Sequence, residues 1–117
     1  MLQINAQSKI FLAIQSVDGR KGMDGLAALC RQQFSIDPLN GAIFVFKNRL
    51  QTTLKVLCYD GQGFLLCAKR LSVGKFKWWP KSTSTVDSIT YRSLQTLICN
   101  GNPASANFSE DWRSLPP

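Results

Sequence analysis

Residues 55–80, KVLCYDGQGFLLCAKRLSVGKFKWWP, decide the fold of this chain. They contain apolar runs on both sides of Asp60-Gly61, a dipeptide that strongly favours a two-residue hairpin turn. With these two residues as the loop, Tyr59 is expected to face Gln62 across the hairpin. The first half of the stretch therefore predicts two antiparallel strands.

The second half of the same stretch alternates cationic and aromatic side chains. Residues 72–74 favour a turn, and residues 75–79 alternate as expected for a strand with one buried face. The outer face of this strand would carry Lys75, Lys77 and Trp79, and the aromatic residues between them would point to the core. This part predicts a second hairpin with a cationic outer surface.

Three elements are expected upstream of these hairpins. Residues 42–47 form a nearly continuous apolar run, which is typical of a central strand buried on both faces. Residues 9–16 predict a strand that adds at an edge of the sheet. Between the two, residues 23–34 carry an apolar stripe at helical spacing, and Asp24 is predicted to cap this helix.

Downstream, Thr90 is predicted to cap a short helix over residues 91–99. The fold class that follows is α+β, because two helices are too few for an alternating α/β layout. We expect a single domain over residues 1–101, with a mostly antiparallel meander sheet, one helix packed on it and a short C-terminal helix. Residues 102–117 are rich in Pro, Ser, Ala and Asn and predict an extended or partly disordered tail.

The chain has 117 residues, a length typical of one domain, and it is 44% hydrophobic and 18% charged. It has 14 lysines and arginines against 7 acidic residues, a formal net charge of +7. This balance favours a polyanionic partner. The N-terminus shows no signal peptide and no run is long enough to span a membrane, so a cytosolic protein without a membrane partner is expected.

The sequence offers little for catalysis. It contains no histidine, and its four cysteines are far apart and lie among apolar neighbours, so we expect no metal site, cofactor or small-molecule ligand. The remaining catalytic alternative is a metal-dependent nuclease, which requires Asp18, Asp24 and Asp60 to converge. Local roles in turns and caps explain the same residues, and we therefore predict a protein that is not an enzyme.

Cationic residues are the best candidates for a functional site. Arg20 and Lys21 lie in a Gly-flanked loop before a helix N-terminus, where anions bind readily. Further cations follow Asp60 and would contact phosphates if they share one face of the sheet, and a tryptophan would stack on an unpaired base. The candidate nucleic-acid-binding residues are Arg20, Lys21, Lys55, Lys69, Arg70, Lys75, Lys77, Trp78 and Trp79.

Four stretches resemble one known family in their order and spacing. They are residues 18–26 (DGRKGMDGL), 41–48 (GAIFVFKN), 55–64 (KVLCYDGQGF) and 69–78, in which KRL is followed by GKFKW. Together they are similar to the TnpB-type accessory protein, the product of the second reading frame, of the insertion-sequence sixty-six family of transposable elements. Relatives usually carry an arginine-rich run after the second stretch, of which only Arg49 is present here.

The resemblance implies a bacterial mobile-element protein, encoded beside a DDE-type transposase, that assists transposition and has no catalytic residues. Two modes of action stay open. Direct binding to DNA at the transposon ends predicts an affinity that falls steeply with salt. Docking on the transposase without DNA contact predicts a complex that tolerates about 200–300 mM salt.

Overall fold

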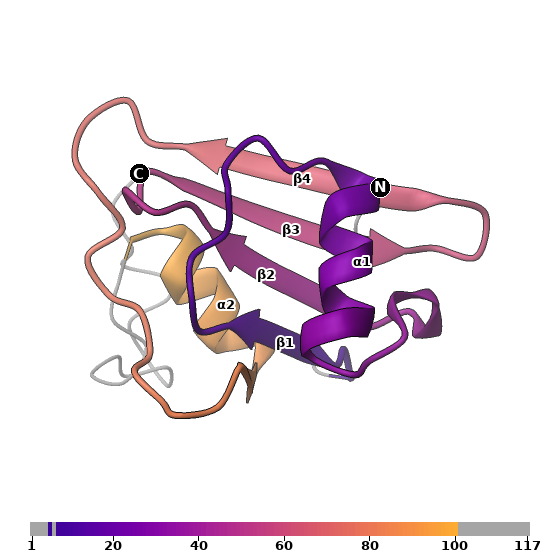
Figure 1. The fold of residues 1–117 in the computed structure, drawn as a ribbon. Helices are drawn as coiled ribbons and strands as arrows, with labels where there is room; N and C mark the ends of the chain where they lie inside the picture. Colours follow the sequence, from indigo (N-terminus) through magenta and orange to yellow (C-terminus); the bar gives the residue numbers. More distant parts are fainter. Residues whose placement is uncertain (1–4, 6, 101–117) are drawn as a thin grey trace.

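The computed structural model describes residue 5 and residues 7–100 of the chain (Figure 1). Its elements, in order along the chain, are β1 Ile10–Ala13, α1 Met23–Gln33, the 3-10 turn η1 Pro38–Asn40, β2 Ile43–Lys47, β3 Thr53–Tyr59, β4 Phe64–Arg70, β5 Val86–Ile89 and α2 Tyr91–Ile98. The predicted tail over residues 102–117 lies outside the described residues.

The five strands form one sheet in the order β4-β3-β2-β1-β5. The neighbours β1 and β2 are parallel and are joined through α1, whereas the other three pairs are antiparallel. The α+β class and the β2-β3-β4 meander are therefore confirmed. The expectation that the first strand lies at an edge is wrong, because β5, which the sequence reading missed, pairs with the outer side of β1.

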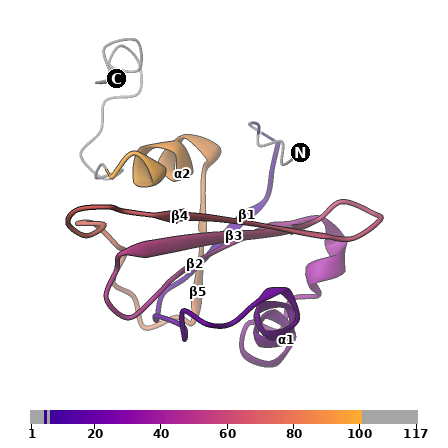
Figure 2. The ribbon, with the colours of Figure 1, turned by 90° about the horizontal axis from the view of Figure 1, so that it is seen from above.

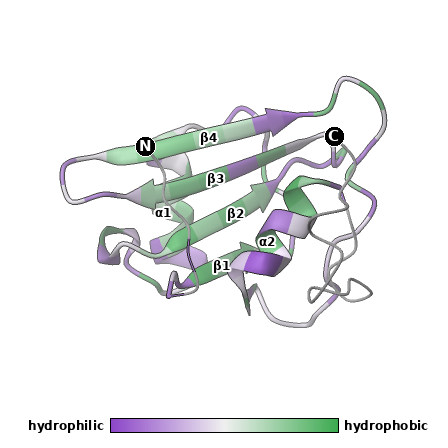
Figure 3. Ribbon diagram, turned by 180° about the vertical axis from the view of Figure 1, so that it is seen from behind, coloured by the Kyte–Doolittle hydropathy of each residue, from purple (hydrophilic) through white to green (hydrophobic). Residues whose placement is uncertain are grey.

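The two helices cover opposite faces of the sheet (Figure 2). Leu26, Ala27 and Cys30 of α1 pack on one face, and Leu94 and Leu97 of α2 pack on the other. Viewed from the α2 side, apolar residues concentrate on the strands and polar residues on the outer side of α2 (Figure 3).

Strand β2 lies in the middle of the sheet and is buried on both faces, as predicted. Phe44 and Phe46 belong to the core under α1, and Ile43 and Val45 belong to the core under α2. The continuous apolar run of β2 thus reflects a strand with a helix layer above and below it.

The β3–β4 hairpin has a longer loop than predicted. Tyr59 pairs with Phe64 and not with Gln62, so the predicted register is wrong by two residues. The Asp60 carboxylate accepts hydrogen bonds from the backbone N–H groups of Gln62 and Gly63 at 2.9 and 3.0 Å and thereby stabilises a four-residue loop. Because the shift is even, every side chain still points to its predicted face.

No fourth meander strand follows β4 in residues 71–85, and the predicted strand over residues 75–79 is wrong. The chain instead crosses one end of the sheet as an irregular segment and reaches β5. Phe76 and Trp79 are both buried, so the strict alternation expected of a strand is absent. The aromatic residues of this segment fill the core under α2, and that packing replaces a strand ladder.

Of the two predicted helix caps, the one on α2 is confirmed and the one on α1 is wrong. Thr90 caps α2 as expected, since its hydroxyl accepts a hydrogen bond from the Ser93 N–H at 3.1 Å. Asp24 does not cap α1: it lies in the first turn, and Gly22 occupies the N-cap position without a side-chain bond. An acidic residue in the first turn still interacts favourably with the helix dipole.

Candidate nucleic-acid interface

Three irregular connections gather at one end of the sheet. Strands β1, β2 and β4 end there, and β3 and β5 begin there, as the strand directions in Figure 1 show. We call residues 14–22, 48–52 and 71–85 the loop end of the sheet. Most of the candidate cations lie in these connections or on the adjoining strand residues.

The sheet divides these cations into two groups. Lys55 is two residues along β3 from Thr53, which pairs with Arg70, so Lys55 and Arg70 point to the α1 face. Lys69 pairs with Leu54 and points to the α2 face. The expectation that the cations share one sheet face is therefore wrong, because adjacent residues of a strand point to opposite faces. The α1-side cations are Arg20, Lys21, Lys55 and Arg70, and the α2-side cations are Lys47, Lys69, Lys75, Lys77 and Lys81.

Two of the four α1-side cations, Lys55 and Arg20, are engaged within the protein, whereas Lys21 and Arg70 are exposed and pair with no carboxylate of the described residues. The Lys55 ammonium donates to the backbone carbonyls of Gly19 and Lys21 at 2.7 and 2.8 Å, and so holds the β1–α1 loop against β3. Arg20 forms an ion pair with Asp18 at 3.0 Å. This pair is also hydrogen-bonded through the Arg20 Nε and backbone N–H.

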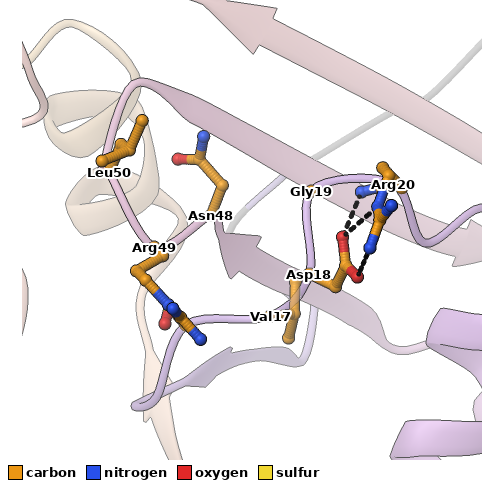
Figure 4. A pocket seen from close by; sticks show the side chains of 8 residues that line it. Val17, Asp18, Gly19, Arg20, Asn48, Arg49 and Leu50 are labelled. Carbon is orange, nitrogen blue, oxygen red and sulfur yellow. Dashed lines mark hydrogen bonds and ion pairs between the residues drawn. The ribbon is translucent and has the colours of Figure 1, made fainter.

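The Arg20–Asp18 pair lines a shallow cavity of about 390 Å³ between the β1–α1 loop and the β2–β3 turn (Figure 4). Hydrogen bonds from Arg20 lower the pKa of Asp18 from 3.8 to about 2. The carboxylate is therefore charged at neutral pH and opposes an incoming phosphate. Arg49, across the cavity in Figure 4, is the exposed cation of this site that has no carboxylate partner among the described residues.

On the α2 side, Lys69 is also engaged. Its ammonium donates to the carbonyl of Ile98 at 2.6 Å, at the last turn of α2. A cation at this position stabilises the negative end of the helix dipole. Lys69 thus fastens α2 to the edge strand β4.

Lys75 and Lys77 also carry exposed charges. Both side chains are exposed, and no carboxylate of the described residues pairs with them. Their backbone is held in place, because the Asn100 amide group donates to the Lys75 carbonyl and accepts from the Lys77 N–H, at 3.0 and 2.9 Å. Within residues 7–100, these two lysines are therefore cations without a carboxylate partner, on a segment whose backbone is held in place.

Gln51 is a second anchor of this segment, and the sequence reading missed it. The Phe76 N–H donates to the Gln51 carbonyl, and the Gln51 side-chain amide donates to the Phe76 carbonyl, both at 2.7 Å. A glutamine in a polar turn carries no sequence signal for such a contact, since the two residues are far apart along the chain.

The two tryptophans have different surroundings. Trp79 is buried, and its indole N–H donates to the Ala13 carbonyl at 2.9 Å. Its predicted place on a cationic outer face is therefore wrong. Trp78 is half-buried and packs against the core under α2. Trp78 is the ring of the pair that keeps partial access to solvent.

The acidic cluster required by the nuclease alternative does not form. Among the described residues, no three cysteine, aspartate or glutamate side chains lie close enough to hold a metal ion together. Asp60 is engaged in the β3–β4 hairpin loop, at the end of the sheet opposite to Asp18. In the same part of the chain, no helix has the length and apolar character to cross a membrane.

Comparisons with known proteins agree with the motif pattern. A family model described as "IS66 Orf2 like protein" matches residues 8–106. The chain is 37% identical over 98 residues to "Uncharacterized protein y4hO" of Sinorhizobium fredii (strain NBRC 101917 / NGR234), which covers 84% of each chain. It is 42% identical over 72 residues to "Uncharacterized protein y4jC" of the same organism, which covers 62% of each chain. No solved structure matches the chain.

Proposed function

The chain belongs to the family of IS66 Orf2-like proteins, and from this premise we propose that it is a non-enzymatic accessory protein of DNA transposition that binds the ends of its element. DNA would be held by phosphate contacts at the loop end of the sheet. The structure offers no recognition helix for a groove among its described elements, so this binding would follow the DNA backbone more than the base sequence.

One observation supports this proposal above the others. Lys75 and Lys77 are exposed, lie two residues apart and are carried by a segment that Asn100, Gln51 and a buried aromatic ring fix in place. Ordered cations without carboxylate partners can meet phosphates without first breaking an ion pair. Each such contact releases counter-ions from the DNA and makes binding depend on salt.

The test is a salt titration of binding to labelled element ends and to unrelated DNA. The test variant is Lys75→Glu/Lys77→Glu. The matched control is Lys9→Glu/Arg31→Glu, which makes the same change in net charge at two exposed positions away from the loop end. We expect the test variant to weaken binding at least tenfold and to lower the salt slope by about two, as loss of two phosphate contacts requires.

The control variant is expected to bind much more like the wild type. Equal losses in the two variants would mean that only net charge matters, and the assigned interface would be wrong. If the wild-type protein does not bind DNA even at low salt, direct DNA binding is excluded.

A second candidate function is docking on the transposase of the same element. Strand β4 is an edge strand, and its residues 67–70 are exposed. The turn that follows it carries Val73, which is 88% exposed. An open edge can accept a strand from a partner through backbone hydrogen bonds.

This docking predicts a complex with the transposase that survives about 200–300 mM salt, because backbone pairing is screened less than exposed charges. The matching variant is Ala68→Pro, since a proline on an edge strand removes a donor from a new ladder. Retained co-purification of this variant with the transposase would contradict docking at β4.

A further inference from the structure

A second cavity of the loop end lies on the α2 side of the sheet. Its volume is about 340 Å³. It is lined by three lysines and by five neutral residues from the end of β1, the β2–β3 turn and the crossing segment, namely Lys47, Lys77, Lys81, Ile14, Gln51, Trp79, Pro80 and Ser82. We call it the lysine recess. None of its lining residues is acidic.

The Lys47 side chain has only neutral groups as its contacts in the recess. Lys47 ends β2 on the α2 side, and its side chain is only partly exposed. The Lys47 ammonium donates to the Gln51 side-chain oxygen at 2.9 Å and lies 5.3 Å from the centre of the Trp79 ring. Both partners are neutral, and burial lowers the pKa of this lysine.

A cation that is partly withdrawn from water usually has a counter-ion. No carboxylate of the described residues serves Lys47 in this way. An anion that enters the recess would supply the missing charge and would also face Lys77 and Lys81.

The walls of the recess are ordered before any ligand arrives. Trp79 is held by its bond to the Ala13 carbonyl, Gln51 by its bond to Phe76, and the Lys77 backbone by Asn100. A site whose side chains are already positioned loses less conformational entropy when a ligand binds.

We propose that the lysine recess binds a phosphate monoester, carried either at the end of a nucleic-acid strand or on a free nucleotide. A monoester has a charge of about −1.5 to −2 at neutral pH and three acceptor oxygens, which suits three ammonium groups. An internal phosphodiester has a single negative charge and suits the recess less well. The cavity also falls within the usual size of ligand pockets, roughly 300–1,000 Å³, which leaves space for a sugar beside the phosphate.

Binding of a strand end rests on the proposed function, and binding of a free nucleotide does not. The first experiment therefore compares oligonucleotides of one sequence with a 5′-phosphate, a 3′-phosphate or hydroxyl groups at both ends. We expect a terminal phosphate to tighten binding about tenfold or more, as charged hydrogen bonds typically do.

The matched variants are Lys81→Gln, which lies in the recess, and Lys75→Gln, which does not line it. Each removes one exposed charge from the same segment. Lys81→Gln should abolish most of the preference for a terminal phosphate, and Lys75→Gln should preserve the preference while weakening all three oligonucleotides equally. Equal binding of all three oligonucleotides to the wild type would overturn the strand-end form of the proposal.

The second experiment measures thermal unfolding with adenosine 5′-monophosphate, with adenosine and with inorganic phosphate. The monophosphate should raise the melting temperature of the wild type, and adenosine should not. Lys47→Met should remove this shift, while its own melting temperature without ligand stays at or above that of the wild type, because the variant no longer buries a cation that pairs with no carboxylate of the described residues.

The outcomes separate this inference from the proposed function. Binding of oligonucleotides without any effect of a terminal phosphate, and without a shift by the monophosphate, would refute the recess and leave DNA binding intact. A shift by the monophosphate that is lost in Lys47→Met, in a protein that binds no oligonucleotide, would support the recess and refute DNA binding.

Discussion

At the loop end, the α1-side cations are two arginines and two lysines and the α2-side cations are five lysines, and members of the two groups differ in what their charges contact. On the α1 side, Lys55 donates to two loop carbonyls and Arg20 is paired with Asp18. On the α2 side, Lys75 and Lys77 have fixed backbones, and their ammonium groups pair with no carboxylate in the part of the chain that the structure describes. A cation that stabilises the fold and a cation that is available to a partner therefore cannot be distinguished by charge alone.

The difference has a structural cause. The β1–α1 loop lies against the sheet, so its carbonyls come within reach of Lys55. The crossing segment over residues 71–85 is attached by its aromatic residues and its backbone, which leaves its lysines outside.

The largest effect is expected from Trp79→Ala, which should release the crossing segment from the core. Lys75 and Lys77 would then no longer lie on an ordered backbone. The change removes a buried aromatic ring and its hydrogen bond to Ala13. We expect a loss of about 3–5 kcal/mol in the free energy of unfolding, measured by urea denaturation. Trp78→Ala is the control, and because Trp78 is only half-buried its loss should be clearly smaller. Similar losses would show that Trp79 is not the principal anchor.

The second prediction concerns Gln51→Ala, which removes no charge. It deletes the side-chain bonds to the Phe76 carbonyl and to Lys47. We expect a loss of about 1–3 kcal/mol in unfolding free energy, because two polar partners lose their contacts. DNA affinity should fall as well, because the segment that carries Lys75 and Lys77 would be held in place less firmly.

The control for this change is Gln32→Ala on the exposed side of α1, with an effect within about 0.5 kcal/mol. Unchanged DNA affinity in Gln51→Ala, despite reduced stability, would mean that the order of the crossing segment does not contribute to binding.

The strand pattern of the sequence was sufficient to predict the central part of the fold. The apolar run of β2 and the two runs beside Asp60-Gly61 gave the β2-β3-β4 meander, because burial on two faces and a hairpin turn leave local signals. The short strand β5 was missed since Val86–Ile89 has only two apolar residues and its pairing with β1 depends on tertiary contacts.

The candidate site was predicted only in part. The cations were found from their charge, but their division into two groups follows from the strand register and from the path of the crossing segment. The alternating pattern of residues 75–79 is typical of a strand because Phe76 and Trp78 both pack into the core. Lys47 and Gln51 carried no signal, since their contacts join residues that only the fold brings together.

The third prediction compares one cation from each group. Lys55→Met keeps the length of the side chain but removes both bonds to the loop carbonyls, and we expect a loss of about 1–2 kcal/mol in unfolding free energy. Lys77→Met should change stability by less than about 0.5 kcal/mol, because the Lys77 side chain is exposed and pairs with no carboxylate of the described residues.

DNA affinity should show the opposite order, with the larger loss in Lys77→Met. The two variants have the same net charge, so nonspecific attraction is equal in both. The same order in stability and in binding would remove the distinction between the two groups.

The smallest effect is expected from the ion pair of Asp18 with Arg20. Because hydrogen bonds from Arg20 lower the pKa of Asp18 to about 2, below its ordinary 3.8, the pair stabilises the folded state fully above about pH 4, and this contribution is lost as the pH falls through 2. Asp18→Asn should therefore reduce the loss of stability between pH 4 and pH 2, and a carboxyl NMR titration of the wild type should give the low pKa directly.

At neutral pH the same change frees Arg20 and removes a negative charge beside Arg49, so it should tighten DNA binding modestly. Asp37→Asn, at the opposite end of the sheet, is the charge-matched control and should leave binding nearly unchanged. If both variants tighten binding equally, the gain comes from net charge, and Arg20 does not become a new phosphate contact when its partner is removed.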